Sequence, residues 1–234
     1  MLNDCRTWLL VGGLLCALGC SGTTRAPSTE ANSSTKADPP LTKQADPPAD
    51  VHSEVEKALK LLEDAKTYRL SSEVTGSDGH TSTRVFEFVS PDRSHLTYDL
   101  NGKHRETITI GKETYIKEDD GPWKKGPLSI GDQLNQFYPK VFSKNLAEST
   151  DLKYIRSEIL DEKPMWVFEY AYKDSLDPAR TRKETVWIGA EDHNLYQLSK
   201  QADTKADGRD VQIKMTRHFS DFNADIQIDV PAAQ

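Results

Sequence analysis

The chain has 234 residues, of which 36% are hydrophobic and 29% charged, and its formal net charge is −7. This length provides one domain with a real core plus some unfolded chain. The Lys and Arg residues are spread among more numerous acids, whereas nucleic-acid binding needs a clustered basic face, so a nucleic-acid partner is not expected. Cys5, Cys16 and Cys20 are the three cysteines, so the rest of the chain has neither a disulfide nor a cysteine-ligated metal.

The N-terminus has the pattern of a secretory signal. An uncharged run from Leu9 to Gly19 follows Arg6 and has the length of a signal core, shorter than a membrane-spanning helix. It ends in Ala17-Leu18-Gly19-Cys20, which resembles the lipobox of bacterial lipoproteins. We therefore expect residues 1–19 to be removed and Cys20 to carry acyl chains that anchor the protein to a membrane. The alternatives are an ordinary secretory signal followed by a free Cys20, or an uncleaved short anchor.

A tether is predicted after the lipidated cysteine, over residues 20–50. It is composed of Ser, Thr, Ala, Pro and charged residues and cannot bury enough surface to offset its chain entropy. Ala37-Asp38-Pro39-Pro40 recurs as Ala45-Asp46-Pro47-Pro48, a repeat that favours extended conformations. The predicted location is the cell envelope. Ser21, rather than Asp, follows the cysteine, and in Gram-negative rods the absence of Asp at this position resembles the pattern of outer-membrane sorting, so in such a cell we expect the outer membrane, facing the periplasm.

A single domain is predicted over residues 51–234, beginning with an amphipathic helix. Asp50 or Ser53 can cap it, and six apolar residues recur at helical spacing. They are Val51, Val55, Ala58, Leu59, Leu62 and Ala65. A second helical segment, divided by Pro139, is expected between Ile130 and Leu152.

The remaining sequence alternates with the period of strands and is rich in β-branched and aromatic residues. Asn101-Gly102 and Gly111-Lys112 are tight hairpin signals. The predicted strands are Tyr68–Thr75, Thr83–Val89, His95–Leu100, Arg105–Ile110, Glu113–Lys117, Tyr154–Leu160, Met165–Tyr172, Lys183–Ile188, Leu195–Gln201, Val211–His218 and Ile226–Val230. The fold class is α+β: a long antiparallel sheet has to twist, so we expect a curved, half-open barrel covered by the two helical segments.

Several segments, in this order, carry a family resemblance. They are the helix from Val51 to Lys66, the strand and turn Arg84–Arg93, the hairpin Ile110–Lys117 with Gly121-Pro122-Trp123-Lys124, the hairpin formed by Val186-Trp187-Ile188-Gly189 and Leu195-Tyr196-Gln197-Leu198, and the turn Phe219-Ser220-Asp221-Phe222. Together they resemble the superfamily of LolA-like and LppX/LprG-like envelope proteins over about residues 50–231. The resemblance implies a half-barrel that holds lipid or acyl chains, in a protein of lipid or lipoprotein trafficking.

Aromatic residues on two strands are the candidate lining of a ligand cavity. Alternation places Phe86 and Phe88 on one face of their strand. It does the same for Trp166, Phe168, Tyr170 and Tyr172. The same residues suit a filled core equally well. Met165, Val167 and Ala171 make the second strand apolar on both sides, which predicts a central position in the sheet.

Two further groups of residues are candidates for ligand contact. Trp123, Leu59 and Leu62 are a candidate lid or plug over the cavity. Arg84 and Arg93 bracket the aromatic strand and can pair with a lipid phosphate, the alternative being solvated strand ends.

Catalytic and metal-binding patterns are not found. The six histidines have no metal-ligand spacing, and the chain contains no nucleophile elbow, phosphate loop or dinucleotide fingerprint. We therefore expect a non-enzymatic protein without a metal or cofactor. The favoured function is binding or transfer of lipid or acyl chains by a membrane-anchored lipoprotein. The alternative is a lipoprotein with a filled core that serves as an interaction platform for envelope protein partners.

Overall fold

The computed structural model describes residues 44–100, 102–127, 142–144, 146, 149, 151–173, 181–206 and 209–232. The chain divides into two compact units, residues 1–39 and 40–234, and every described residue belongs to the second. The predicted signal peptide, Cys20 and the tether as far as residue 43 lie outside the described residues.

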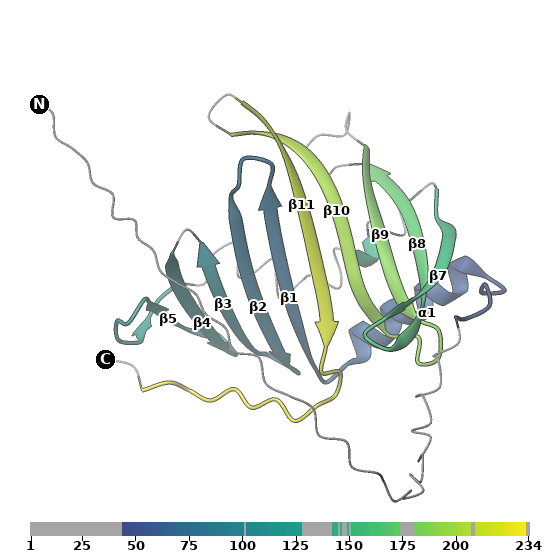
Figure 1. The fold of residues 1–234 in the computed structure, drawn as a ribbon. Helices are drawn as coiled ribbons and strands as arrows, with labels where there is room; N and C mark the ends of the chain where they lie inside the picture. The colour runs from purple at the N-terminus through teal and green to yellow at the C-terminus, as the bar shows by residue number, and fades with distance from the viewer. Residues whose placement is uncertain are drawn as a thin grey trace, which may run out of the picture. The chain divides into compact units, whose positions relative to one another are not determined.

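The described strands form one antiparallel sheet of eleven strands (Figure 1). Their spatial order is β6-β5-β4-β3-β2-β1-β11-β10-β9-β8-β7. The bounds are β1 Thr67–Gly76, β2 Thr81–Val89, β3 Arg93–Leu100, β4 Lys103–Ile110, β5 Glu113–Glu118, β6 Lys124–Lys125, β7 Lys153–Leu160, β8 Lys163–Lys173, β9 Thr181–Gly189, β10 Leu195–Ala206 and β11 Arg209–Ser220. The sheet is open, with β6 and β7 at its edges.

Two meanders meet in the middle of this sheet. β1 to β6 run outward in chain order to one edge, and β7 to β11 run inward from the other. They join where β1 pairs with β11, with Leu70 opposite Phe219. The predicted two-residue turns connect β3 to β4 and β4 to β5, and Gly102 and Gly111 have φ values of 78° and 60°, which glycine adopts without strain.

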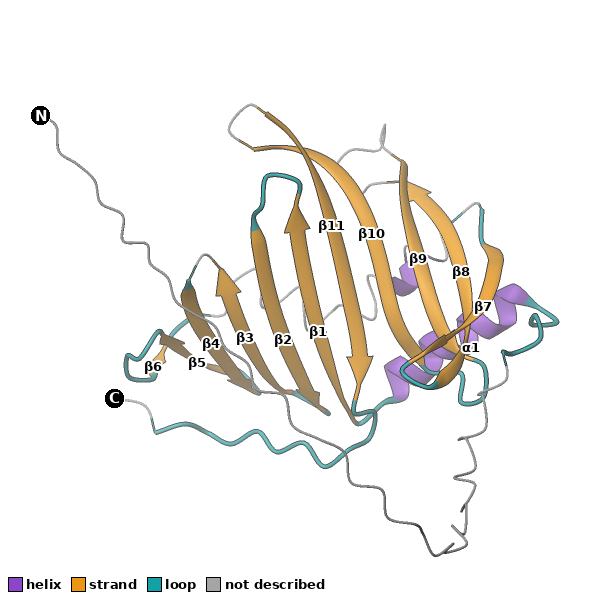
Figure 2. Cartoon of the chain, in the orientation of Figure 1, coloured by secondary structure: helices purple, strands orange, loops and turns teal. Residues whose placement is uncertain are grey.

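Helix α1, the one long helix among the described residues, spans Val51–Asp64 and packs against the sheet (Figure 2). The Asp50 carboxylate caps it by accepting hydrogen bonds from the backbone N–H groups of His52 at 3.0 Å and Ser53 at 3.4 Å. Val55, Ala58, Leu59 and Leu62 are buried, whereas Leu61 on the opposite side of the helix is 37% exposed. The amphipathic pattern therefore turns one stripe of the helix toward the sheet.

The two faces of the sheet differ in what covers them. We call the face that carries Phe86 and Phe168, and on which α1 packs, the helix face, and the opposite one the outer face. The main core lies on the helix face and combines α1 with residues of β1, β2, β3 and β8 to β11. A smaller cluster of Met165, Val167 and Trp187 lies on the outer face.

The antiparallel sheet and the N-terminal helix are confirmed, although the described residues are mostly β rather than α+β, and every predicted strand except the last corresponds to an observed one. The last was wrong, because residues 224–232 form no strand. This segment is held by side chains instead: Thr67 Oγ1 donates to the Ala224 carbonyl at 2.7 Å, and Arg93 Nη1 to the Ile228 carbonyl at 2.8 Å. The two-residue strand β6 was not predicted. The sheet is neither closed nor strongly curled.

Three other predictions differ from the structure or lie partly outside its described residues. β8 is not central but lies next to the edge strand β7, and its outer apolar side chains are buried by the small cluster around Trp187. The predicted helical insertion falls mostly outside the described residues, although Phe142 and Leu146 are helical and buried in the main core. Residues 44–49, predicted as the end of the tether, line a pocket against the domain.

Candidate functional site

Aromatic side chains gather on the helix face of β7 to β10, a region that we call the aromatic half. Phe168 and Tyr170 on β8 are fully buried, and Trp166 and Tyr172 nearly so. The Phe168 ring lies 6.1 Å from Tyr154, and the Tyr170 ring lies 6.0 Å from Phe142 and 5.8 Å from Tyr172, measured between centroids. Such offset or edge contacts add to the free energy gained from burial. Four aliphatic side chains complete the region: Val186, Ile188, Leu195 and Leu198.

The remaining cavity candidates belong to the same core. Phe86 is buried and Phe88 half-buried on β2, and the Tyr68 ring lies between them and Phe219, with centroid distances of 5.3–6.3 Å. Leu59 and Leu62 of α1 are buried in this cluster. The structure thus brings all six aromatic candidates and the two leucines together on one face.

A buried carboxylate, that of Glu184, lies at the end of the aromatic half that contains Tyr170 and Tyr172. Glu184 on β9 is 4% exposed and accepts hydrogen bonds from the hydroxyls of Tyr170 and, at 2.9 Å, Tyr172. Lys200 Nζ on β10 lies 3.8 Å from its Oε1. The hydroxyls of two aromatic residues therefore satisfy the hydrogen-bonding capacity of the buried acid in this region. Sequence reasoning missed Glu184, although its position two residues before Val186 places it on the same face.

The residues before α1 lie against the other end of the aromatic half, at Trp166. Trp166 Nε1 donates a hydrogen bond to the Asp46 carbonyl at 2.7 Å. His193 Nδ1 lies 2.6 Å from a carboxylate oxygen of Glu54, and its ring centroid is 5.7 Å from that of Trp166. A pocket of about 470 Å³ lies here, lined by residues 44–49 together with Trp166 and Glu191. The aromatic half is thus bordered by the segment that leads toward the predicted anchor.

The helix face of β2 to β5 has a different composition, and we call it the hydroxyl half. Its buried side chains include Ser82, Ser94, Thr107, Thr109 and Thr114. The hydroxyls of Thr109 and Thr114 face each other at 3.5 Å across β4 and β5. Leu96 is the buried aliphatic residue of this half. The signal was present in the sequence, since Thr107 and Thr109 alternate along one strand.

The predicted headgroup arginines lie on opposite faces. Arg84 is on the helix face, two residues before Phe86, and its guanidinium stacks 4.5 Å from the centroid of the Tyr98 ring. Arg93 is on the outer face, where it holds the C-terminal segment through the Ile228 carbonyl. The structure therefore separates them. Trp123 is half-buried beside Lys117 at the β5–β6 edge and does not belong to the main core.

Cations on the outer face are neutralised by acids of neighbouring strands. Arg69 pairs with Glu87 at 2.8 Å and with Asp221, and the hydrogen bond with Glu87 is the main reason that the pKa of Arg69 is raised. His95 lies between Glu87 at 3.3 Å and Glu106 at 3.1 Å. Burial alone would raise the pKa of Glu106, but hydrogen bonds from Lys117 and His95 outweigh it and lower the pKa.

Two features of the described residues concern membranes and metals. No helix in this part of the chain is long and apolar enough to cross a membrane. Within the same residues, no group of three or more His, Cys, Asp or Glu side chains is placed to hold a metal ion.

Solved structures share this arrangement. LppX, a lipoprotein of Mycobacterium tuberculosis, matches with a TM-score of 0.57 at 18% identity over 76% of this chain and 98% of that one. LprF from Mycobacterium bovis matches with a TM-score of 0.55 at 13% identity over 81% and 100%.

The domain has the LppX fold. A LolA-superfamily protein from Nitrosomonas europaea also matches, with a TM-score of 0.29 at 12% identity over 79% of this chain and 96% of that one. No protein-family model and no curated protein sequence matches the chain. The predicted resemblance is confirmed as a resemblance of fold.

Proposed function

We propose that this protein is a non-enzymatic envelope lipoprotein that binds or transfers lipid, holding acyl chains between α1 and the helix face. The observation that carries the proposal is the continuous apolar surface of the aromatic half, on a sheet with the LppX fold. The open sheet would be one wall of a half-barrel, and α1 with the predicted helical insertion would be its cover.

The physical argument concerns the interface between helix and sheet. α1 contributes only apolar side chains to the main core, so an acyl chain that enters there would replace one hydrocarbon contact with another. Burying each methylene group contributes about 0.8 kcal/mol, so a chain of ordinary length gains enough to offset displacement of the helix. Leu59 and Leu62 are then the cover, in the role predicted for them, and the aromatic side chains are the wall.

Native mass spectrometry of the protein purified from cells tests the proposal. We expect adducts with the masses of lipids that disappear on organic extraction and return when lipid is added. Leu62→Gln, which places an amide in the interface, should reduce the bound fraction, and Leu61→Gln on the exposed side of the same helix is the matched control. A protein that is uniformly free of lipid, before and after addition, would contradict the proposal.

Anchoring through Cys20 is a separate part of the proposal. A lipid attached there would hold the domain at the envelope membrane, by way of the tether between Cys20 and the residues that border Trp166. Cys20→Ala should leave the domain folded and release it from the membrane fraction, whereas Cys16→Ala should not. Continued membrane attachment of the Cys20 variant would contradict anchoring but not lipid binding.

A second candidate function is an interaction platform for an envelope protein. The observation that favours it is the complete burial of Phe168, Tyr170, Val186 and Ile188, which fill the interface without a ligand. Crosslinking in living cells would then trap one defined partner, while the purified protein would bind no lipid.

A further inference from the structure

The two ends of helix α1 are held in different ways. At the C-terminal end only two residues separate α1 from β1. The backbone of the second, Lys66, is hydrogen-bonded on both sides: its N–H donates to the Asn223 side chain at 2.8 Å, and its carbonyl accepts from the Ser90 N–H at 2.7 Å. Glu63 in the last turn accepts a hydrogen bond from the Ser143 hydroxyl at 2.8 Å. This end is therefore fixed by the chain itself and by three other segments.

The N-terminal end is held by the segment that precedes it, residues 44–50, which we call the strap. The Gln44 side-chain amide donates to the Ser157 carbonyl on the edge strand β7. The Asp46 carbonyl accepts the indole N–H of Trp166 on β8 at 2.7 Å. The strap thus leads from β7 past β8 to the N-cap of α1, and a small number of hydrogen bonds holds it there.

A second contact joins the start of α1 to the β9–β10 turn. His193 Nδ1 lies 2.6 Å from Oε2 of Glu54, and because an ionised carboxylate only accepts hydrogen bonds, Nδ1 is the donor. Each of the two side chains is 22% exposed, so the contact is partly shielded from water. The His193 ring lies 5.7 Å from the Trp166 ring between centroids. Trp166 is therefore next to both contacts that hold this end of the helix.

The strap lies beside an opening to the main core. The pocket of about 470 Å³ described above is lined by strap residues, by Pro164, Trp166 and Ala190, and by the acids Glu54 and Glu191. Trp166 belongs to the main core and Ala190 packs against it. The pocket therefore ends at the apolar interface between α1 and the sheet.

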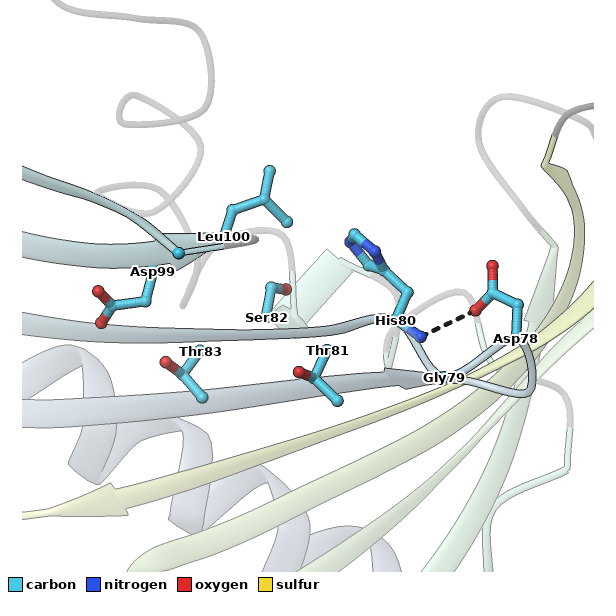
Figure 3. Close-up of a pocket in the computed structure, with 9 residues that line it drawn as sticks. Asp78, Gly79, His80, Thr81, Ser82, Thr83, Asp99 and Leu100 are labelled. Atoms are coloured by element: carbon cyan, nitrogen blue, oxygen red, sulfur yellow. Dashed lines mark hydrogen bonds between the residues drawn. The ribbon is translucent and has the colours of Figure 1, made fainter. Parts of the chain in front are cut away.

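A second pocket, at the turns of the hydroxyl half, has a different lining. It measures about 490 Å³ and lies between the β1–β2 and β3–β4 turns (Figure 3). Polar groups predominate in it: the Asp78 carboxylate, for example, accepts a hydrogen bond from the His80 N–H at 3.1 Å. None of the residues that line it belongs to the main core. Of these two pockets, the one beside Trp166 is thus the one that leads to the apolar interface.

We infer that the strap and the Glu54–His193 contact form a latch, and that α1 opens from its N-terminal end, turning about residues 65–66, to admit acyl chains at Trp166. This inference rests on the proposed lipid-binding function and adds where the interface opens and what keeps it closed. The latch can open because single hydrogen bonds contribute little net free energy in water, whereas the other end of α1 is joined covalently to β1.

A closed latch lowers the apparent affinity for lipid. While α1 covers the interface, an acyl chain binds only to the fraction of molecules in which the latch is open. The apparent Kd is the intrinsic Kd divided by that fraction. Loosening the latch should therefore tighten binding and speed association by the same factor. Dissociation should stay unchanged, because the latch is already open in the bound state.

Two substitutions loosen the latch without altering the apolar wall. Gln44→Ala removes the hydrogen bond to β7, and Glu54→Ala removes the partner of His193. Glu56→Ala removes a carboxylate from the exposed side of the same helix and is the matched control. Circular dichroism checks that the full chain is folded in each case.

Amide hydrogen exchange tests the latch without lipid. In the double variant Gln44→Ala/Glu54→Ala, exchange in residues 55–58 should accelerate roughly threefold or more, because the N-terminal end of α1 opens more often. Exchange in residues 61–64, next to the fixed end, should not change. The Glu56→Ala protein should match the wild type in both segments.

Lipid binding tests the consequence. The probe is dioctanoylglycerol, which is uncharged and therefore suits an entrance lined by Glu54 and Glu191. Calorimetric titration should show roughly threefold to tenfold tighter binding by the double variant than by the wild type. Stopped-flow tryptophan fluorescence should show the same increase in the association rate constant, and Glu56→Ala should leave both quantities unchanged.

The outcomes separate the latch from the proposed function. Unchanged exchange in residues 55–58 of the double variant would overturn the inference, and so would faster exchange with unchanged lipid association. Equal acceleration in residues 61–64 would mean that the whole helix loosens, which contradicts opening from one end. Absence of dioctanoylglycerol binding by the wild type and the variants alike would contradict lipid binding itself.

Discussion

The aromatic half and the hydroxyl half share one sheet and one face but are built from different side chains. On β8, every helix-face residue from Trp166 to Tyr172 is aromatic and buried. On β4, the buried residues at the corresponding positions are Thr107 and Thr109. Both sets have high strand propensity, so the backbone is equally regular in the two halves.

The difference teaches that strand propensity and core strength are separate properties. An aromatic residue buries a large apolar area, whereas a buried threonine gains little area and must also satisfy its hydroxyl. We therefore expect the aromatic half to provide most of the free energy of folding and to hold α1. The helix face of the hydroxyl half also carries polar and charged side chains, such as Arg84 stacked on Tyr98.

The largest expected effect comes from comparing the two halves directly. Phe168→Ala should lower the free energy of unfolding by about 3–5 kcal/mol, because it empties a fully buried site. Thr107→Ala should lower it by about 1 kcal/mol. Urea unfolding monitored by circular dichroism measures both, and Phe168→Leu gives a smaller loss should the alanine variant not fold. Equal losses at the two positions would refute the comparison.

The next effect concerns the acid of the aromatic half. Glu184→Leu should lower the free energy of unfolding by about 1–3 kcal/mol, because the buried hydroxyls of Tyr170 and Tyr172 lose their acceptor. Glu169→Leu on the outer face of β8 is the matched control. Its pairs with Lys153 at 3.0 Å and Lys183 at 3.6 Å are partly exposed, so its cost should stay below about 1 kcal/mol. Similar costs would mean that burial of Glu184 is unimportant.

A smaller effect tests whether α1 stabilises the aromatic half and not the hydroxyl half. Asp50→Ala removes the N-cap and should lower the free energy of unfolding by about 1 kcal/mol. Amide hydrogen exchange should accelerate in β8 and β9 but not in β3 and β4. Asp64→Ala, which removes an exposed pair with Lys60 at 3.3 Å, should change exchange in neither. Uniform acceleration across the sheet would show that the halves are not independent.

The smallest effect is a titration on the outer side of the hydroxyl half. The hydrogen bond with Asp99, helped by the charge of Asp99 and Glu106, raises the pKa of His104 above its ordinary 6.5. This pair therefore stabilises the hairpin fully below the unfolded-state pKa, and the contribution is lost as the pH rises through the folded-state pKa. NMR titration of Asp99→Asn should show a lower pKa for His104. An unchanged value would mean that the pair is not formed in solution.

The sequence was sufficient for the local part of the fold. Alternation and turn residues such as Gly102 and Gly111 predict strands and hairpins, because these depend on neighbours in the chain. Residues 226–230 alternate in the same way, yet they form no strand, since pattern alone does not reveal whether a pairing edge is free. The predicted central position of β8 was wrong for a related reason. Met165 and Val167 are buried by a small outer-face cluster with Trp187, although β8 lies next to the edge of the sheet.

The site was predicted in its apolar part and missed in its polar part. Alternation within β2 and within β8, which is visible in sequence, places each strand's aromatic side chains on one face, whereas strand pairing places the two sets on the same face of the sheet. Contacts between the two meanders depend on the pairing of β1 with β11, which joins Ser72 to Arg217 across most of the domain. Glu184 was missed because its burial depends on partners from β8 and β10.

The junction of the two meanders also shapes how the protein is made. Each meander can form from hairpins between strands adjacent in the chain as soon as those strands are synthesised, but the β1–β11 ladder joins the first strand to the last. Pairing across so long a stretch of chain costs loop entropy and is slow. Until the final strand arrives, β1 has an unpaired edge that is prone to aggregation, so we expect formation of the central ladder to be the slow and vulnerable step of folding.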